Sequence, residues 1–261
     1  MFSNEPRVRY ENPQLVEVIC QLRFPEILTI NASEPAAFQE RIRRDYPLYS
    51  KRAENAPPRL ADGKPVRTEP INNYQFLAAD SRSRINLTQG FVALSTHGYG
   101  SWEQFAGRLD AMLAAFIETY HPSWFTRVGL RYVNAFHRES LGLEGRSWKE
   151  LIEPPFLGLL SHVDVEEGLL LKNEQSVTLQ MPGGTKANIK CGPGVMRRTN
   201  TATRQTQEQR VFMLDLDLFM DGRLELSQTA PALSILHNNA DDLFRGAVTD
   251  TLHEAMGPTE L

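Results

Sequence analysis

The sequence predicts an α+β fold, with a largely antiparallel β-sheet and two long helices on one of its faces. The first observation is the stretch from Ser101 to Asn134, in which a helical pattern passes directly into a strand pattern. The second is a series of short β-branched and aromatic segments at hairpin-scale separations, which favours antiparallel pairing. The third is an amphipathic pattern near the C-terminus, from about Thr229 to Leu252. Helices of this kind bury their apolar stripe against a sheet.

The first half of the chain is expected to hold a strand, a short helix, three strands and a long helix. Ser33 is a suitable N-cap for the short helix, and Pro47 ends it because the residue before proline disfavours helical backbone. Four prolines between Ser50 and Pro70 indicate a surface loop or a hairpin excursion. The expected strands cover residues 16–24, 74–79, 84–88 and 91–96.

The long helix of this half is expected to begin at a Ser101 N-cap and to end at His121-Pro122. Apolar residues recur along it at three- and four-residue steps and indicate one buried stripe, formed by Trp102, Phe105, Leu109, Met112, Phe116 and Tyr120.

The second half shows the same order of elements, which suggests a duplicated unit with a boundary between residues 122 and 123. Domains 1–122 and 123–261, or one continuous domain, are the two alternatives. A loop is expected after Pro154-Pro155, and a polar loop is expected from Met196 to Arg210. Strands are expected at 124–136, 163–171, 176–181, 187–191 and 210–219, with a short helix at 148–152 and the long C-terminal helix after them.

Composition excludes several classes of protein. The chain has 261 residues, of which 41% are apolar and 23% charged, as in ordinary globular domains. Its net charge of −4 gives no general attraction to nucleic acid or to an anionic membrane. Two cysteines do not form a disulfide framework, and no apolar run approaches about 18 residues. We therefore expect a soluble, cytoplasmic protein that has no membrane partner and no cofactor.

Two segments resemble a bacterial protein family of about this length. One is Asn12-Pro13-Gln14-Leu15-Val16-Glu17-Val18, and the other is Arg127-Val128-Gly129-Leu130-Arg131-Tyr132-Val133-Asn134, which follows a helix that begins with tryptophan. The family is sporadically distributed and has no characterised function. The resemblance therefore implies no catalytic residue, and the patchy distribution associates the chain only loosely with mobile-element or defence loci.

The second of these segments carries the main candidate for partner binding. Arg127, Gly129 and Arg131 alternate along one face of the expected strand, and Asn134 lies at its end. This face can bind phosphate or carboxylate, with Gly129 allowing close approach. Alternatively, the arginines cover an open sheet face or pair with acidic neighbours such as Glu17.

Asp215 and Asp217 alternate with leucines, so both carboxylates share one face of a strand. Carboxylates in this arrangement can hold Mg²⁺ or Mn²⁺ for phosphoester chemistry, although such a site needs further ligands. The alternation also fits a sheet with an apolar inner face and an acidic outer face, and it allows cross-strand ion pairs with Arg127 and Arg131.

The expected loop from Met196 to Arg210 is basic, because Arg197, Arg198 and Arg204 are opposed mainly by Glu208. Such a loop can contact nucleic-acid phosphates, and it can equally be a solvated connection. It lacks the aromatic residues that favour binding of single strands. No nucleophile motif is found, and the six histidines are scattered.

The leading hypothesis is therefore a non-enzymatic binding or interaction module. The alternatives are a metal-dependent phosphoester-acting enzyme and a nucleic-acid-binding accessory protein. A further alternative, a subunit that needs a protein partner or a second copy of itself, predicts apolar side chains at an exposed strand edge.

Overall fold

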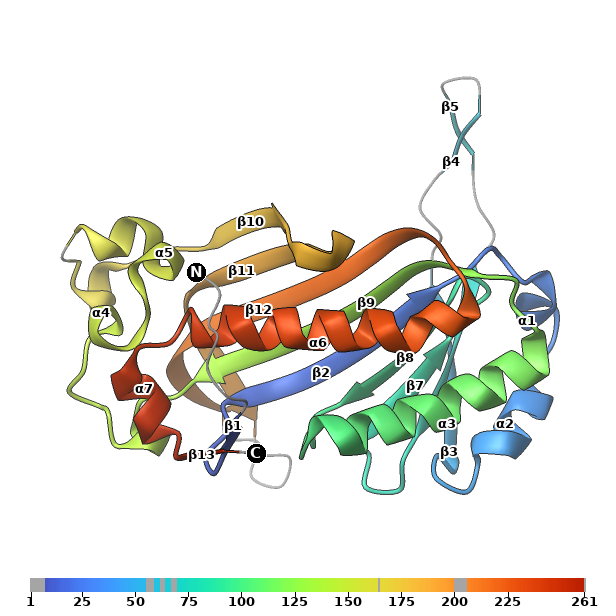
Figure 1. Ribbon diagram of the computed structural model, residues 1–261, viewed down its shortest axis with the longest axis horizontal. Coiled ribbons are helices and arrows are strands. Elements are labelled where there is room, and N and C mark those ends of the chain that lie inside the picture. Colours follow the sequence, from blue (N-terminus) through green and yellow to red (C-terminus); the bar gives the residue numbers. More distant parts are fainter. Residues whose placement is uncertain are drawn as a thin grey trace. The chain divides into compact units, whose positions relative to one another are not determined.

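A computed structural model describes residues 8–54, 59–61, 64–66, 70–163, 165–199 and 206–260. Its main feature is a nine-stranded antiparallel sheet with the strand order β10-β11-β12-β9-β2-β8-β7-β6-β3 (Figure 1). The strands are β2 (Leu15–Arg23), β3 (Leu48–Glu54), β6 (Ile71–Leu77), β7 (Ser83–Leu87), β8 (Phe91–Thr96), β9 (Phe125–Phe136), β10 (Gln175–Gln180), β11 (Lys186–Thr199) and β12 (Thr206–Leu224). The predicted α+β class is confirmed, and the predicted duplication stays a prediction.

The chain forms two compact units, and neither of them is a continuous stretch of sequence. Unit 1 comprises Met1–Glu17, Leu130–Phe219 and Leu233–Leu261. Unit 2 comprises Val18–Gly129 and Met220–Ala232. The domain boundary predicted at residues 122 and 123 stays a prediction.

Unit 2 contains the helices α1 (Leu28–Ala32), α2 (Ala36–Ile42) and α3 (Trp102–Tyr120), and a small hairpin of β4 (Arg59–Ala61) and β5 (Lys64–Val66). The predicted Ser101 cap of α3 is confirmed, because its side chain accepts a hydrogen bond from the Gln104 backbone N–H. The apolar stripe of α3 packs on the strands, with the rings of Phe116 and Phe24 4.8 Å apart. The predicted Ser33 cap is wrong, because Ser33 ends α1 and Pro35 precedes α2.

Unit 1 contains α4 (Trp148–Leu151), α5 (Pro154–Leu157), α6 (Thr229–Arg245, continuing from unit 2), α7 (Asp250–Ala255), and a small ladder of β1 (Val8–Tyr10) with β13 (Pro258–Glu260). Helix α6 packs on β9, where the rings of Phe244 and Phe136 are 6.0 Å apart. Leu214, Leu216 and Leu218 of β12 are fully buried. They form the inner face of the strands in this unit.

Four predictions about unit 1 are wrong, each for a local reason. Pro154-Pro155 begins α5 instead of a loop, because proline fits the first helical turn. The described residues of the strand predicted at 163–171 form no strand and include a 3₁₀ turn, Glu167–Leu169. The described ends of the predicted Met196–Arg210 loop belong to β11 and β12. The single C-terminal helix is two helices, interrupted where Val248 forms a β-bridge with Ile152.

None of the helices in the described part of the chain combines the length and the apolar character that a membrane crossing requires.

Candidate functional site

Arg131 lies on the outer face of unit 1 and forms a two-pronged ion pair with Asp215. Its Nε donates to Asp215 Oδ1 at 2.7 Å, and its Nη2 donates to Oδ2 at 2.6 Å. The hydrogen bonds to Asp215, together with the charges of Asp215, Asp217 and Glu17, raise the pKa of Arg131 against the effect of burial. A planar guanidinium and a carboxylate fit each other in this way. Arg131 therefore has an internal partner, one of the alternatives that the sequence left open.

Asp217 continues the polar face across β11 to β10. Asn188 donates from Nδ2 to Asp217 Oδ2 at 3.4 Å and accepts from the Thr178 hydroxyl at 2.9 Å. Among the described residues, no group of three or more His, Cys, Asp or Glu side chains is arranged to hold a metal ion. The two aspartates thus belong to a network of neighbouring side chains on the outer face.

Arg127 and Gly129 belong to unit 2, and the arginine side chain lies over the glycine. A Cβ at position 129 would be 2.3 Å from Arg127 Nη1 and 2.9 Å from its Cζ. The space that Gly129 provides is therefore filled by the Arg127 guanidinium. The sequence predicted that Gly129 allows another group to come close to the strand. In the structure that group is the Arg127 side chain, in the place expected for a ligand.

Asn134 lies on the opposite face of β9 from Arg131, because the two positions differ by an odd number of residues. It is buried, and its Nδ2 donates to the Leu214 carbonyl at 3.4 Å. The structure therefore does not bring Asn134 together with the outer-face arginine.

The basic segment is described only in part. Arg197 is exposed and pairs with Glu208 across the β11–β12 ladder, with 2.7 Å between Nε and Oε1. The side chain of Arg198 and the whole of Arg204 lie outside the described residues. The predicted contact with nucleic acid stays a prediction.

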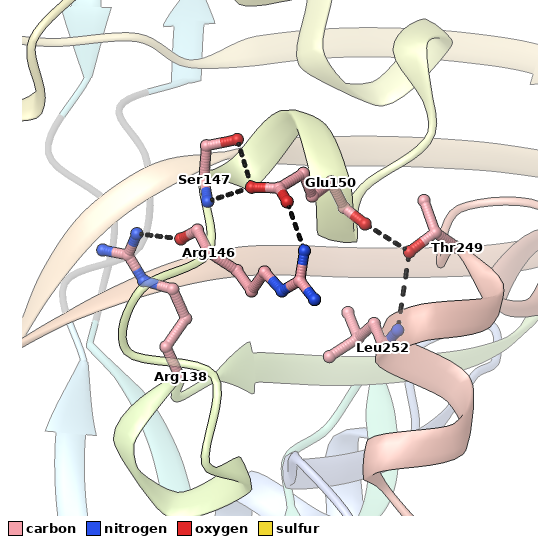
Figure 2. Close-up of polar contacts among 6 residues, drawn as sticks. All are labelled: Arg138, Arg146, Ser147, Glu150, Thr249 and Leu252. Carbon is pink, nitrogen blue, oxygen red and sulfur yellow. Dashed lines mark hydrogen bonds and ion pairs between the residues drawn. The ribbon is translucent and has the colours of Figure 1, made fainter.

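A second polar cluster joins residues 138–150 to the start of α7 (Figure 2). Arg138 donates to the Arg146 carbonyl at 2.8 Å and stacks 4.4 Å above the Trp148 ring. Glu150 caps α4 by accepting from the Ser147 backbone N–H at 2.8 Å. Thr249 donates to the Glu150 carbonyl at 2.8 Å and accepts from Leu252 N–H. These contacts satisfy helix ends and anchor a loop.

The edge strand β10 is a feature that the sequence analysis did not single out. It is a terminal strand of the nine-stranded sheet, and no described strand pairs with its outer side. Its six residues, Gln-Ser-Val-Thr-Leu-Gln, include no charge and no proline. Natural edge strands usually carry such residues because these discourage pairing with other chains. The other terminal strand, β3, carries Lys51 and Arg52.

Exposed apolar side chains concentrate in the segment that leads into β10. Leu171 is 99% exposed, Leu169 is 72% exposed, and Val177 on the strand itself is 45% exposed. In a strand at 163–171, alternate residues would have been buried, but the turns of this segment leave them in solvent. The exposed members of the segment are Leu159, Val163, Val165, Leu169, Leu171 and Val177.

Comparisons with known proteins identify no family for this chain. A scan against protein-family models finds no match, and a search of curated proteins finds no significant similarity.

Proposed function

We propose that this chain is a non-enzymatic interaction module that binds a protein along the β10 edge of unit 1. The observation that carries the proposal is the group of exposed apolar side chains between Leu159 and Val177, which lead into an uncharged edge strand. Exposed apolar groups near an open strand edge are typical of protein interaction sites. An added strand would gain backbone hydrogen bonds from β10 and apolar contacts from Val177 and Leu171.

The pairing of β10 with β11 indicates which pattern of apolar and polar side chains a partner strand needs. Val177 and Leu179 lie opposite Ile189 and Ala187, which are buried, so their side chains belong to the inner face of the sheet. Ser176 and Thr178 lie opposite Lys190 and Asn188 on the outer face. A partner strand that continues both faces would alternate apolar and polar side chains.

The two alternatives from the sequence have less support. Asp215, the first candidate metal ligand, is already paired with Arg131. Arg197, the one candidate of the basic segment whose side chain is described, is paired with Glu208. Neither pairing requires an external ligand, whereas the exposed apolar side chains before β10 would lose contact with water on binding a protein.

Site-specific photo-crosslinking in cells that make this protein tests the proposal. A photoreactive phenylalanine analogue at Val177 or Leu171 is expected to form a covalent adduct with a protein of defined mass. The same analogue at Ser50, an exposed position on β3, is the matched control. Adducts at Val177 and Leu171 that do not exceed those at Ser50 would overturn the proposal. An adduct with any defined protein, including a second copy of this chain, supports it.

A further inference from the structure

We infer that the occupant of the β10 edge is a second copy of this chain, joined by antiparallel pairing of the two β10 strands around Thr178. This inference rests on the proposed function and names its partner.

Symmetry fixes the allowed registers. A twofold axis that relates two neighbouring antiparallel strands is perpendicular to the sheet. It therefore places inner-face residues of one strand beside inner-face residues of the other. Only registers that pair residues of the same parity satisfy this condition. Two such registers lie near the middle of β10, one centred on Val177 and one centred on Thr178.

The register centred on Thr178 matches chemistry on both faces. On the inner face it pairs Val177 of each copy with Leu179 of the other, so that apolar side chains meet twice. On the outer face it pairs the two Thr178 side chains with each other, and Ser176 with Gln180. Cross-strand pairs of these kinds stabilise a sheet. The register centred on Val177 instead pairs Gln175 with Leu179, a polar residue with an apolar one.

The two terminal strands of the sheet differ in charge, since β10 carries none and β3 carries Lys51 and Arg52. Self-pairing of β10 brings no like charges together, because residues 175–180 carry none. Self-pairing of β3 around its centre would place Lys51 opposite Lys51, and like charges directly opposite are destabilising. This difference in charge favours self-association through the β10 edge over self-association through the β3 edge.

The segment before β10 adds apolar contacts to the same interface. In the Thr178 register, Gln175 of one copy lies level with Met181 of the other, so the segment that precedes Gln175 continues towards the turn Pro182–Gly184. Ile235 packs close to this turn, since a Cβ on Gly183 would be 2.8 Å from Ile235 Cγ2, and Ile235 is 37% exposed. The segment of the second copy that carries Leu171 is therefore directed towards an exposed apolar residue.

Sedimentation velocity of the full chain between about 1 and 100 µM tests the inference, because a small strand-edge interface predicts a measurable equilibrium in this range. The wild-type chain is expected to pass from monomer to dimer. Thr178→Lys, which puts two lysines on the axis, should weaken dimerisation about tenfold or more. Ser50→Lys on β3 is the matched control and should leave dimerisation unchanged.

Disulfide trapping tests the register independently. Opposed residues of an antiparallel pair have Cα atoms about 4.5–5.5 Å apart, within disulfide reach. Thr178→Cys should therefore form a covalent dimer on mild oxidation, and Ser50→Cys should not. The native Cys20 and Cys191 are buried, and burial raises the pKa of both thiols, to about 11 for Cys191. They are expected to contribute little.

Two results would overturn the inference. One is a chain that stays monomeric at every concentration. The other is a dimer that persists in Thr178→Lys and is trapped as readily by Ser50→Cys as by Thr178→Cys. In either case the proposed function stands if photo-crosslinking at Val177 or Leu171 captures a different protein, and it fails if the adducts at these positions do not exceed those at Ser50. Circular dichroism of each variant shows whether it is folded, and a misfolded Thr178→Lys would be replaced by Thr178→Glu.

Discussion

Arg131 lies within the electrostatic influence of three carboxylates, those of Asp215, Asp217 and Glu17. Its side chain is 44% exposed, whereas that of Asp215 is only 16% exposed. An exposed ion pair contributes little because water screens it, but the two-pronged geometry and the more buried carboxylate make this pair stronger than most. Position 131 therefore has a structural role of its own, and substitutions there test stability as well as binding.

We expect Arg131→Glu to lower the free energy of unfolding by about 1–2 kcal/mol, because it removes the pair and adds a fourth negative charge. Urea unfolding measures this effect. The double variant Arg131→Glu with Asp215→Arg reverses the pair and should recover part of the loss. A double variant that is as unstable as the sum of the two single variants would show that the pair contributes nothing.

The alternation of β9 could be predicted from the sequence, but the partner of Arg131 could not. A period of two already places Asn134 on the other face from Arg131, and the structure buries Asn134 as that period requires. Asp215 is 84 residues away along the chain. Strand order decides which distant carboxylate meets the arginine, and no local pattern encodes that order.

Glu150 gives a pH dependence whose sign is defined. Hydrogen bonds from Arg146, from the Ser147 backbone and from the Ser147 side chain lower the pKa of Glu150 from 4.5 to about 2 (Figure 2). The folded-state pKa is depressed, so the carboxylate stabilises the fold above its unfolded pKa. This contribution is lost as the pH falls from 4.5 towards about 2.

Glu150→Gln should therefore be less stable than the wild type at neutral pH, and the difference should shrink as the pH falls through this range. Urea unfolding at a series of pH values measures the difference. Glu144→Gln, which removes an exposed carboxylate outside the α4 cap, is the control. A difference that stays constant down to pH 2 would contradict the assignment.

Among the elements, α7 depends on one side chain at its start. The Thr249 hydroxyl caps the helix by accepting from Leu252 N–H and also donates to the carbonyl of Glu150 in α4. We expect Thr249→Ala to lower the free energy of unfolding by about 1–2 kcal/mol, as for other helix caps. Thr249→Ser keeps both hydrogen bonds and should cost clearly less in thermal or urea unfolding. Equal losses for alanine and serine would contradict this role.

The predicted elements that failed were those without a clear local pattern. The strand predicted at 187–191 is longer in the structure, because β11 continues through Gly192-Pro193-Gly194. A Cβ at position 192 would be 2.2 Å from the Asn173 carbonyl oxygen, so glycine serves close approach of another backbone segment there. The exposed segment before β10 was predicted as a strand because it is rich in apolar residues. Apolar composition alone does not distinguish a buried strand from an exposed segment of turns.

At the scale of the whole molecule, unit 1 draws residues from both of the halves predicted from the sequence. Val8 pairs with Glu260 in the β1–β13 ladder. The Tyr10 ring packs edge-on against Phe244 at 5.7 Å, and its hydroxyl lies 2.8 Å from His253 Nδ1. The Gln14 carbonyl accepts from the Ala135 N–H at 2.8 Å. Residues 8–17 thus contribute packing and ladder contacts to a unit that otherwise lies beyond residue 129.

This arrangement predicts how the chain responds to division at the boundary between residues 122 and 123. The fragment 123–261 lacks the strand partner of β13 and the ring that covers Phe244, so we expect it to unfold without a cooperative urea transition. Fragments 1–122 and 123–261 mixed in equal amounts should recover a cooperative transition, because every contact of unit 1 is then available. A cooperative transition of 123–261 alone would show that the second half folds by itself. It would support the duplicated-domain alternative, since residues 8–17 would then be dispensable for the packing of α6 and α7.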